Sequence, residues 1–339
     1  MKRILQIDGG GIRGIIPAIV LEHLEEKCGK PLGQCFDLIT GTSTGSIIGG
    51  AIAAGVPAKK IRELYADKGK ELFTRRTLLN PFNWLRGKYD GERFKNEMGK
   101  LSGINKTGEQ VKFEDLILAD LTPRFVATTF NLLSQRTHFI NSWDDKPYKK
   151  IQDKSRKLLD VISWSALSAV YYFDPITVDN FEWQDRLTGD VKKGAFFEDG
   201  GQGAHNNTLG YVLAEILACR WTQQEEVYVL SLGTGYQPHI FHNGVLKKGI
   251  SFVKRLSSYL LGCQAGKESA VTQILAVHYI CDNKPNEHPH IEFKRIDAPL
   301  AKEKVSDLDK VEYIKEYQAI GDKLKNSINQ NDIDYLLVK

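Results

Sequence analysis

Residues 36–54 decide the fold, and they read FDLITGTSTGSIIGGAIAA. A short apolar run over 36–39 leads into the turn Gly-Thr-Ser-Thr-Gly at 41–45, and a small, apolar, helix-like stretch over 46–54 follows. This order predicts a strand, a tight turn and a helix, which would expose the turn serine at a helix N-terminus. There the helix dipole favours an alkoxide as it forms.

The turn fits the pattern Gly-x-Ser-x-Gly, with Gly41 and Gly45 on either side of Ser43. At average composition the pattern occurs by chance in about one chain of this length in ten. Its strand before and helix after are therefore what favour Ser43 as a nucleophile. A turn serine that caps the helix at Ser46 is the structural alternative.

The same order of elements opens the chain, with a strand over 3–7, a glycine-rich turn over 8–14 and a helix from Ile15 that stops at Gly29. Pro57 can open a helix to about Phe73, and Asp90 can cap another. Later strands are expected over 124–132, 137–140, 195–198 and 227–232, with a helix over 157–169. This alternation predicts an α/β fold with a mostly parallel central sheet flanked by helices on both faces.

The C-terminal portion is expected to be mainly helical. Helices are predicted over 252–261, 268–280 and 307–328, with a late strand over 291–296. The sequence shows no internal repeat or proline-rich linker. We therefore expect a catalytic core over 1–240, with residues 241–339 packed on the same domain.

Composition excludes several classes of protein. The 339 residues are 42% apolar and 26% charged, as in a soluble globular protein, and the net charge of +4 is too small to favour duplex nucleic acid as a partner. Five cysteines without a Cys-x-x-Cys pair signal neither zinc nor redox chemistry. The N-terminal residues resemble no signal peptide, so we expect a cytoplasmic protein. The longest apolar stretch, 47–56, is about half the length that spans a bilayer.

The turn over 8–14 reads Asp-Gly-Gly-Gly-Ile-Arg-Gly and also satisfies the dinucleotide-binding pattern Gly-x-Gly-x-x-Gly. That fingerprint expects an acidic residue about 20 positions on, after the next strand, whereas Glu22, Glu25 and Glu26 fall inside the first helix. The other use of such a loop is to aim backbone amides at an oxyanion, each worth about 3 kcal/mol of barrier. A plain turn is the structural alternative, although three consecutive glycines cost backbone entropy.

A base for the serine is expected at Asp199, which follows the strand over 195–198 and precedes two glycines. That setting presents a carboxylate at the end of a strand, where α/β active sites assemble, although aspartate before glycine is also a common turn device. No histidine stands in an informative motif. The eight histidines are scattered: His23, His138, His205, His239, His242, His278, His288 and His290.

Together the three segments resemble the patatin-like phospholipase family over roughly residues 2–236. The family's Asp-Gly-Gly-Gly-x-Arg-Gly turn is met at 8–14, its Gly-x-Ser-x-Gly elbow at 41–45 and its Asp-Gly-Gly/Ala at 199–201. Further matches are Phe36-Asp37, Lys88-Tyr89-Asp90-Gly91, Asn206-Asn207 and Ser-Leu-Gly-Thr-Gly at 231–235.

The resemblance implies a Ser-Asp dyad without histidine. Asp199 accepts the proton of Ser43, which attacks a lipid ester, and the amides of Gly9, Gly10 and Gly11 hold the oxyanion. Water then resolves the acyl-enzyme, and neither a metal nor a cofactor is needed. The implied substrate is a glycerophospholipid.

Supporting roles follow from the same resemblance. Arg13 would hold the glycine loop or compensate charge near Asp8, with a surface arginine on a turn as the alternative. The other supporting positions are glycines: Gly14, Gly41, Gly45, Gly200 and Gly201.

One segment departs from the family pattern. Where the family has Ala-Thr-Ser-Ala-Ala-Pro-x-Tyr-Phe, residues 165–173 read Ser-Ala-Leu-Ser-Ala-Val-Tyr-Tyr-Phe, which lacks the proline and adds the bulky Tyr171. The departure bears on the shape of the acyl pocket, and hence on chain-length and headgroup preference.

The implied partner is a phospholipid membrane surface. Residues 73–89 and 247–261 interleave aromatic with basic side chains, which suits a peripheral site at the inner membrane face but equally an ordinary packed helix. Some bacterial relatives are anti-phage effectors switched on by cyclic nucleotides, which suggests such an activator here, although no nucleotide pocket is recognisable. The rival functions are a serine acyltransferase and a nucleotide-binding regulatory module built on the glycine loop. The oligomeric state is left open.

Overall fold

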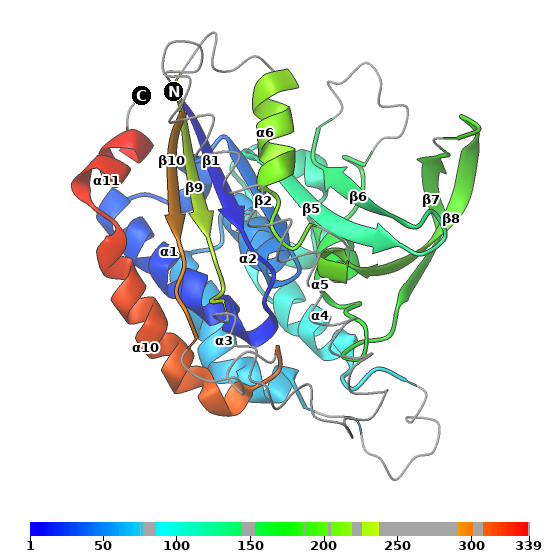
Figure 1. Ribbon diagram of the computed structural model, residues 1–339, viewed down its shortest axis with the longest axis horizontal. Helices are drawn as coiled ribbons and strands as arrows, with labels where there is room; N and C mark the ends of the chain where they lie inside the picture. The colour runs from blue at the N-terminus through cyan, green and yellow to red at the C-terminus, as the bar shows by residue number, and fades with distance from the viewer. Residues whose placement is uncertain are drawn as a thin grey trace, which may run out of the picture.

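The computed structural model describes residues 1–74, 76, 86–143, 153–185, 187–202, 205–218, 226–236, 291–300 and 308–337. These residues are built around one eight-stranded sheet in the order β10-β9-β1-β2-β5-β8-β7, with β6 paired to β5 (Figure 1). The strands are β1 (Lys2–Ile7), β2 (Leu38–Thr42), β5 (Arg124–Asn131), β6 (Arg136–Asn141), β7 (Ile176–Gln184), β8 (Val191–Asp199), β9 (Val227–Leu232) and β10 (Ile291–Ile296).

The sheet is mostly parallel, as the sequence predicted. From β10 through β9, β1 and β2 to β5 every neighbouring pair is parallel. β6 and β8 run antiparallel to β5, and β7 runs antiparallel to β8. A small separate hairpin joins β3 (Ser102–Ile104) to β4 (Gln110–Lys112).

Helices cover both faces of the sheet, which confirms the predicted fold class. Figure 1 shows α1, α3, α10 and α11 together on one side of the parallel strands and α6 on the other. The helices are α1 (Ile15–Cys28), α2 (Thr44–Ala53), α3 (Ala58–Leu72), α4 (Gly91–Gly99), α5 (Leu158–Ala166), α6 (Leu209–Ala218), α10 (Ile314–Leu324) and α11 (Gln330–Leu337).

Successive side chains of β1 pack into two different apolar cores, one on each face of the sheet. Leu5 and Ile7 belong to the large apolar core that contains α1 and α2, whereas Ile4 packs in a smaller cluster with residues of α6. Parallel strands that are buried on both faces read as nearly continuous apolar runs. Gln6 interrupts the run and is fully buried, so its amide needs partners inside the protein.

Most predicted elements lie within a few residues of the observed ones. β9 and β10 match the predicted ranges, α1 begins at Ile15, and its last turn closes at Gly29 in the left-handed conformation, with φ of 65°. The range 307–328 holds a shorter helix, α10, and the helices predicted over 252–261 and 268–280 lie outside the described residues.

Sequence analysis missed β7, α6 and α11. β7 reads Ile-Thr-Val-Asp-Asn-Phe-Glu-Trp-Gln and lies at an edge of the sheet, where most of its side chains are exposed or half-buried. An edge strand of this kind lacks the continuous apolar run that identified the central strands.

Candidate active site

Ser43 occupies a sharp turn between β2 and α2. Its backbone has φ of 54° and ψ of −129°, a conformation that costs a non-glycine residue about 1–3 kcal/mol. The turn is held because the Ser43 amide donates to Ser165 Oγ at 3.2 Å, and the Ser43 carbonyl accepts from the Ser46 amide at 2.8 Å and its hydroxyl at 2.7 Å. The elbow thus presents the serine in a strained geometry that its neighbours support.

The two glycines of the elbow are required by close backbone approach. A Cβ at Gly41 would lie 2.3 Å from the carbonyl oxygen of Gly45, and a Cβ at Gly45 would lie 2.2 Å from the carbonyl oxygen of Ile7. Both positions therefore need glycine for β1, β2 and α2 to meet where they do.

Strand register brings Asp199 to the serine. Thr42, the residue before Ser43, pairs with Thr128 on β5, and the next residue of β5, Thr129, pairs with Asp199 on β8. The hydroxyls of Thr42 and Thr128 lie 2.6 Å apart and reinforce this alignment. The ends of two strands far apart in sequence therefore meet at one point.

The Asp199 carboxylate accepts a hydrogen bond from the Gly201 amide at 2.7 Å, and the nearby Ser43 side chain lowers its pKa. Its side chain is buried. Burial raises the pKa of Asp199 to about 7, and the interactions with Ser43 and the Gly201 amide oppose that rise only in part. A carboxylate with a pKa near neutrality is suited to exchange protons with a hydroxyl.

The glycines after Asp199 also permit close contacts. A Cβ at Gly200 would lie 2.2 Å from Thr128 Oγ1, and one at Gly201 would lie 2.9 Å from Asn206 Oδ1. The turn that follows β8 can therefore fold tightly against β5 and Asn206.

The glycine loop lies against the serine, because a Cβ added at Gly9 would be 3.0 Å from the Ser43 Cβ. The Gly9 amide donates to the Asn206 carbonyl at 3.1 Å, and the Ile12 amide donates to the Leu308 carbonyl at 2.8 Å. Between them, the amides of Gly10 and Gly11 have no acceptor among the described residues. The family resemblance assigned three amides to an oxyanion, and two of them have no other acceptor in the part of the chain that the structure describes.

Arg13 holds the glycine loop and does not pair with Asp8. Its guanidinium donates to the carbonyls of Gly10 at 3.2 Å and Gly235 at 3.4 Å. The cation beside Asp8 is Arg295 of β10, at 2.6 Å. Sequence analysis missed Arg295 because it stands in none of the recognised motifs. Gly14 allows the end of the loop to approach α2, since a Cβ there would lie 2.4 Å from Thr44 Oγ1.

An apolar cavity of about 30 Å³ opens beside Ser43. Helices α2 to α5, the glycine loop, the segment that follows α5 and the C-terminal segment at Leu308 supply its walls. Its lining residues are Gly11, Ser43, Thr44, Ile47, Tyr65, Phe73, Phe94, Ala166, Leu167, Ala169, Tyr172, Phe173 and Leu308.

The segment that departs from the family pattern contributes directly to this cavity. Leu167, Tyr172 and Phe173 line it, whereas the bulky Tyr171 is 57% exposed and adopts φ of 73°. The departure therefore acts through the neighbours of Tyr171, because the Tyr171 side chain itself points to solvent.

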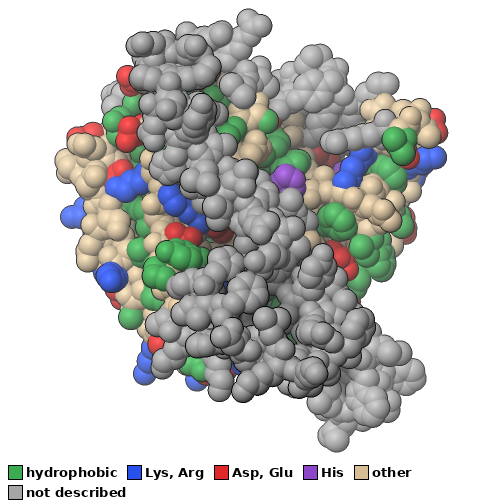
Figure 2. Space-filling model, viewed as in Figure 1, with side chains coloured by type: hydrophobic (Ala, Val, Ile, Leu, Met, Phe, Trp, Pro, Cys, Tyr) green, Lys and Arg blue, Asp and Glu red, His purple; other side chains and the backbone are tan. Residues whose placement is uncertain are grey.

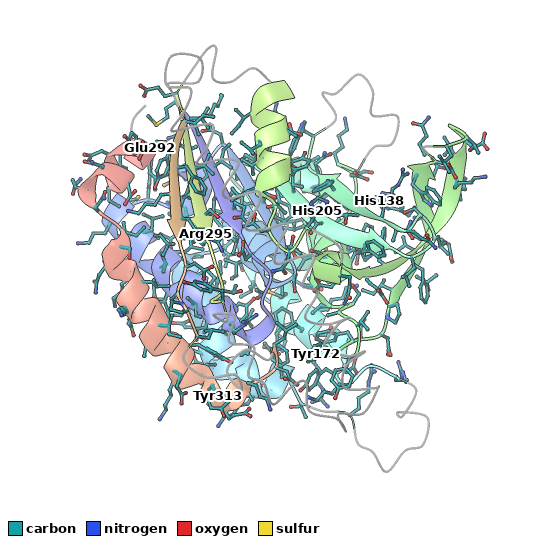
Figure 3. All side chains as sticks on the ribbon, viewed as in Figure 1. His138, Tyr172, His205, Glu292, Arg295 and Tyr313 are labelled. Atoms are coloured by element: carbon teal, nitrogen blue, oxygen red, sulfur yellow. The ribbon has the colours of Figure 1, made fainter. Side chains whose placement is uncertain are left out.

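Two of the histidines, His205 and His138, pack through their rings. His205 lies edge-on to Phe139, with ring centroids 5.1 Å apart, and its carbonyl accepts from Thr42 Oγ1 at 2.7 Å. Burial lowers the pKa of His205. His138 on β6 packs against Phe181, and Figure 3 places both histidines beside β5 and β6. Neither arrangement is that of a base bonded to Ser43.

On the described surface of the face in Figure 2, acidic and basic side chains are interspersed, in keeping with the small net charge. Among the described residues no three metal-ligating side chains come together. None of the helices that the structure describes is long and apolar enough to cross a bilayer. Most of 73–89 and all of 247–261, the segments considered for membrane contact, lie outside the described residues.

Comparison with known proteins adds to this geometry. The model of the family described as patatin-like phospholipase matches residues 5–201, more than half of the chain. The chain belongs to the patatin-like phospholipase family. The matched region contains the glycine loop, the elbow and the Asp199 turn, and so confirms the resemblance drawn from their motifs.

Several relatives are similar to this chain over half of its length or more. A cGAMP-activated phospholipase of Pseudomonas aeruginosa is 30% identical over 172 residues, which cover 50% of this chain and 47% of that protein. A cGAMP-activated phospholipase of Escherichia coli is 25% identical over 83% of this chain and 74% of its own length. Patatin-17 of Solanum cardiophyllum is 28% identical over 69% of this chain and 61% of its own.

The family match ends at residue 201, directly after the Asp199 turn. β9 and β10 lie beyond it, yet the turn after β9 supplies Thr234 and Gly235, and β10 supplies Arg295. These residues contact the glycine loop or Asp8. In this patatin-like chain, residues that contact the glycine loop and Asp8 therefore lie beyond residues 5–201, the region that the family model matches.

Proposed function

We propose that this chain hydrolyses fatty-acyl esters of glycerophospholipids, with Ser43 as the nucleophile and Asp199 as its base. The observation that carries the proposal is that strand register brings Ser43, on its strained elbow, beside the buried carboxylate of Asp199, whose pKa is about 7. Family membership supports the reaction class.

In the proposed first step, Asp199 takes the hydroxyl proton as Ser43 Oγ bonds to the acyl carbon. The carbonyl oxygen becomes an oxyanion, which accepts hydrogen bonds from the amides of Gly10 and Gly11. The ester bond then breaks, and the lysophospholipid leaves with the proton that Asp199 returns to its oxygen.

In the second step, water attacks the acyl-enzyme. Asp199 takes a proton from the water as its oxygen bonds to the acyl carbon, and a second oxyanion forms at the same two amides. The bond to Ser43 Oγ breaks, Ser43 recovers the proton, and a fatty acid is released. One carboxylate serves as base and then acid in both halves, which suits a group with a pKa near neutrality.

The apolar cavity is proposed as the entrance of an acyl chain. Its volume of about 30 Å³ is about two to three times the smallest cavity that holds a water molecule, so a long acyl chain can enter only if lining side chains move. Leu167, Phe94 and Leu308 lie in that lining and would change the acyl preference when substituted. The free energy needed to open the cavity would also keep turnover low away from a lipid surface.

The relatives named cGAMP-activated phospholipases support a further part of the proposal. We propose that a cyclic nucleotide activates this chain at the inner face of a membrane, as part of an antiviral response. Fatty-acid release from mixed phospholipid vesicles, with and without cGAMP, measures this directly. Equal fatty-acid release with and without cGAMP would contradict activation by this nucleotide but would not contradict the proposed hydrolase activity.

The central experiment is covalent labelling by a fluorophosphonate, a probe that captures activated serines. Mass spectrometry of the labelled, folded protein should place the adduct on Ser43. Absence of any adduct, together with nucleotide binding at the glycine loop, would favour the regulatory module. Acyl transfer to an added alcohol in preference to water would favour the acyltransferase.

A further inference from the structure

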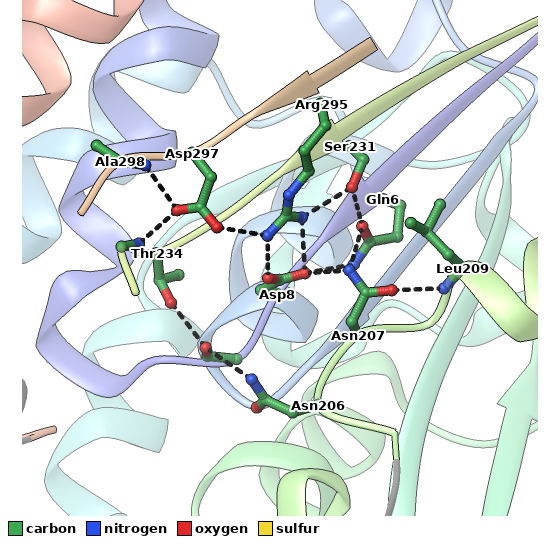
Figure 4. Close-up of polar contacts among 12 residues, drawn as sticks. Gln6, Asp8, Asn206, Asn207, Leu209, Ser231, Thr234, Arg295, Asp297 and Ala298 are labelled. Atoms are coloured by element: carbon green, nitrogen blue, oxygen red, sulfur yellow. Dashed lines mark hydrogen bonds and ion pairs between the residues drawn. The ribbon is translucent and has the colours of Figure 1, made fainter. Parts of the chain in front are cut away.

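A mostly buried arginine of β10 lies beside Asp8 at the start of the glycine loop, as the close-up in Figure 4 shows. Arg295 contacts both oxygens of Asp8, at 2.6 Å and 3.1 Å, and Asp297 Oδ2 at 2.6 Å. The side chains of these three residues are 11–15% exposed. Asp8 is the first residue after β1 and directly precedes the three glycines, so the arginine fixes the start of the loop.

The Asp8 carboxylate is saturated by partners from separate elements. Besides Arg295, its Oδ1 accepts from Gln6 Nε2 at 2.9 Å and from Asn207 Nδ2 at 2.8 Å. Arg295 also donates to Ser231 Oγ on β9 at 2.8 Å. Buried polar groups of this kind are stable only when every member has partners, so the network holds β1, β9 and β10 in one arrangement.

Asp297 carries the contact to the other end of the loop. It accepts from the Gly235 amide at 2.9 Å, and the Gly235 carbonyl accepts from Arg13 at 3.4 Å. The neighbouring Thr234 donates its hydroxyl to the Gly9 carbonyl at 2.8 Å. Arg295 is therefore joined to the loop at Asp8 directly and at Arg13 through Asp297 and Gly235.

The two amides proposed for the oxyanion lie between these attachment points. Glycine has the greatest backbone freedom of any residue, so the loop would sample other conformations if its ends were released. Oxyanion stabilisation requires donors that are already aimed before charge develops. The amides of Gly10 and Gly11 consequently depend on distant contacts for their orientation.

Arg295 is suited to holding the loop because its guanidinium stays positively charged. Burial opposes the charge, but the adjacent carboxylates of Asp8 and Asp297 raise the pKa of Arg295 above its usual value. Its planar guanidinium can also meet two carboxylates at fixed angles, which a lysine ammonium cannot reproduce.

We propose that Arg295 is a positioning residue that holds the glycine loop in the conformation in which the amides of Gly10 and Gly11 face the oxyanion. This inference rests on the proposed function of those two amides. It also gives the part of the chain beyond the family match a role in the chemistry.

Arg295→Lys is the informative variant, since it keeps the charge but loses the forked contact. With a soluble ester we expect kcat to fall about 10- to 100-fold, somewhat less than removal of an oxyanion donor, with KM within about twofold of wild type. The rate of fluorophosphonate labelling at Ser43 should fall in parallel, because that reaction also develops negative charge on an oxygen facing the loop.

Lys294→Met is the matched control on the same strand. Lys294 forms an ion pair with the buried carboxylate of Asp332 on α11, away from the glycine loop. The control thus removes a β10 ion pair of comparable burial, and it should lower the melting temperature while kcat stays within about twofold of wild type. Asp297→Asn is the second test variant, because it keeps the side-chain shape and should lower kcat about 3- to 10-fold if Arg295→Lys fails to fold.

The outcomes separate this inference from the function on which it rests. A wild-type protein without labelling at Ser43 contradicts the proposed hydrolase. A labelled wild type whose folded Arg295→Lys variant keeps its kcat and labelling rate overturns only the positioning role. Equal losses of kcat in Lys294→Met and Arg295→Lys would also overturn the positioning role, because Arg295 would then act only as a structural ion pair. If Arg295→Lys does not fold, an unchanged kcat in Asp297→Asn would overturn the positioning role instead.

Discussion

The elbow at Ser43 and the glycine loop at 8–14 face each other but are held in different ways. The Ser43 backbone is bonded to Ser46, three positions on, and to Ser165, 122 positions on, and the two glycines of the turn meet neighbours in β1 and α2. The glycine loop is held by Asn206, Thr234 and Arg295, which lie 197 to 287 positions away. The nucleophile is thus largely a local structure, whereas its electrostatic partner is assembled from the whole sheet.

The largest effect is expected from Ser43→Ala, which removes the nucleophile from the locally held elbow. Ester turnover should fall by at least about 10³-fold. Stability should change little, because alanine meets the same positive φ as serine, whereas Ser43→Gly should raise the melting temperature by relieving that strain. Turnover on a soluble ester and melting curves for the three proteins measure both. Turnover retained in folded Ser43→Ala would exclude the serine mechanism.

Asp199→Asn should be nearly as damaging, with a loss of about 10³-fold or more, because asparagine cannot accept the serine proton. His205→Ala is the comparison and should cost less than about fivefold, since the ring packs on Phe139 and only the backbone carbonyl bonds to Thr42. Soluble-ester turnover of both variants is the measurement. Loss of activity in folded His205→Ala would instead identify a histidine base.

Substitutions in the glycine loop test its long-range support. A Cβ at Gly10 would lie 2.2 Å from Thr234 Oγ1, and a Cβ at Gly11 would lie 2.2 Å from the Leu308 carbonyl oxygen at a φ of 58°. Gly10→Ala and Gly11→Ala should therefore displace the free amides and lower kcat about 10²-fold, while vesicle binding survives. Weaker vesicle binding with unchanged turnover per bound enzyme would indicate a ligand-binding loop.

The smallest expected effects come from the raised pKa of Asp199. As pH rises through that pKa, turnover should increase and stability should decrease. Turnover should rise with pH and reach half of its maximum near pH 7, because only the ionised carboxylate accepts a proton. A flat profile of kcat/KM between pH 5 and 9 would exclude Asp199 as the base.

Stability should move the other way. Because the pKa rises from 3.8 to about 7 on folding, the stability that the protonated form contributes is complete below pH 3.8 and is lost as pH rises through 7. The loss is on the order of 4 kcal/mol at most. Asp199→Asn should therefore melt above wild type at pH 8, and that advantage should shrink toward pH 4. Equal melting temperatures at pH 8 would mean that burial of Asp199 costs little.

The sequence by itself determined the central strands, the α/β class and the residues of the elbow. Those signals are local: β1, β2 and β9 are short apolar runs, and the turns after them carry glycines at fixed spacing. The motif around Asp199 was recognisable for the same reason, although β8 runs antiparallel to β5.

The tertiary structure alone decided how those residues are supported. It directed the Gly9 amide to Asn206, turned Tyr171 to solvent and placed Arg295 against Asp8. Each outcome depends on which strands are neighbours and in which register they pair. A contact between residues 287 positions apart arises only when β10 pairs with β9 and β9 with β1, because side-chain burial and ion pairing are properties of neighbours in space.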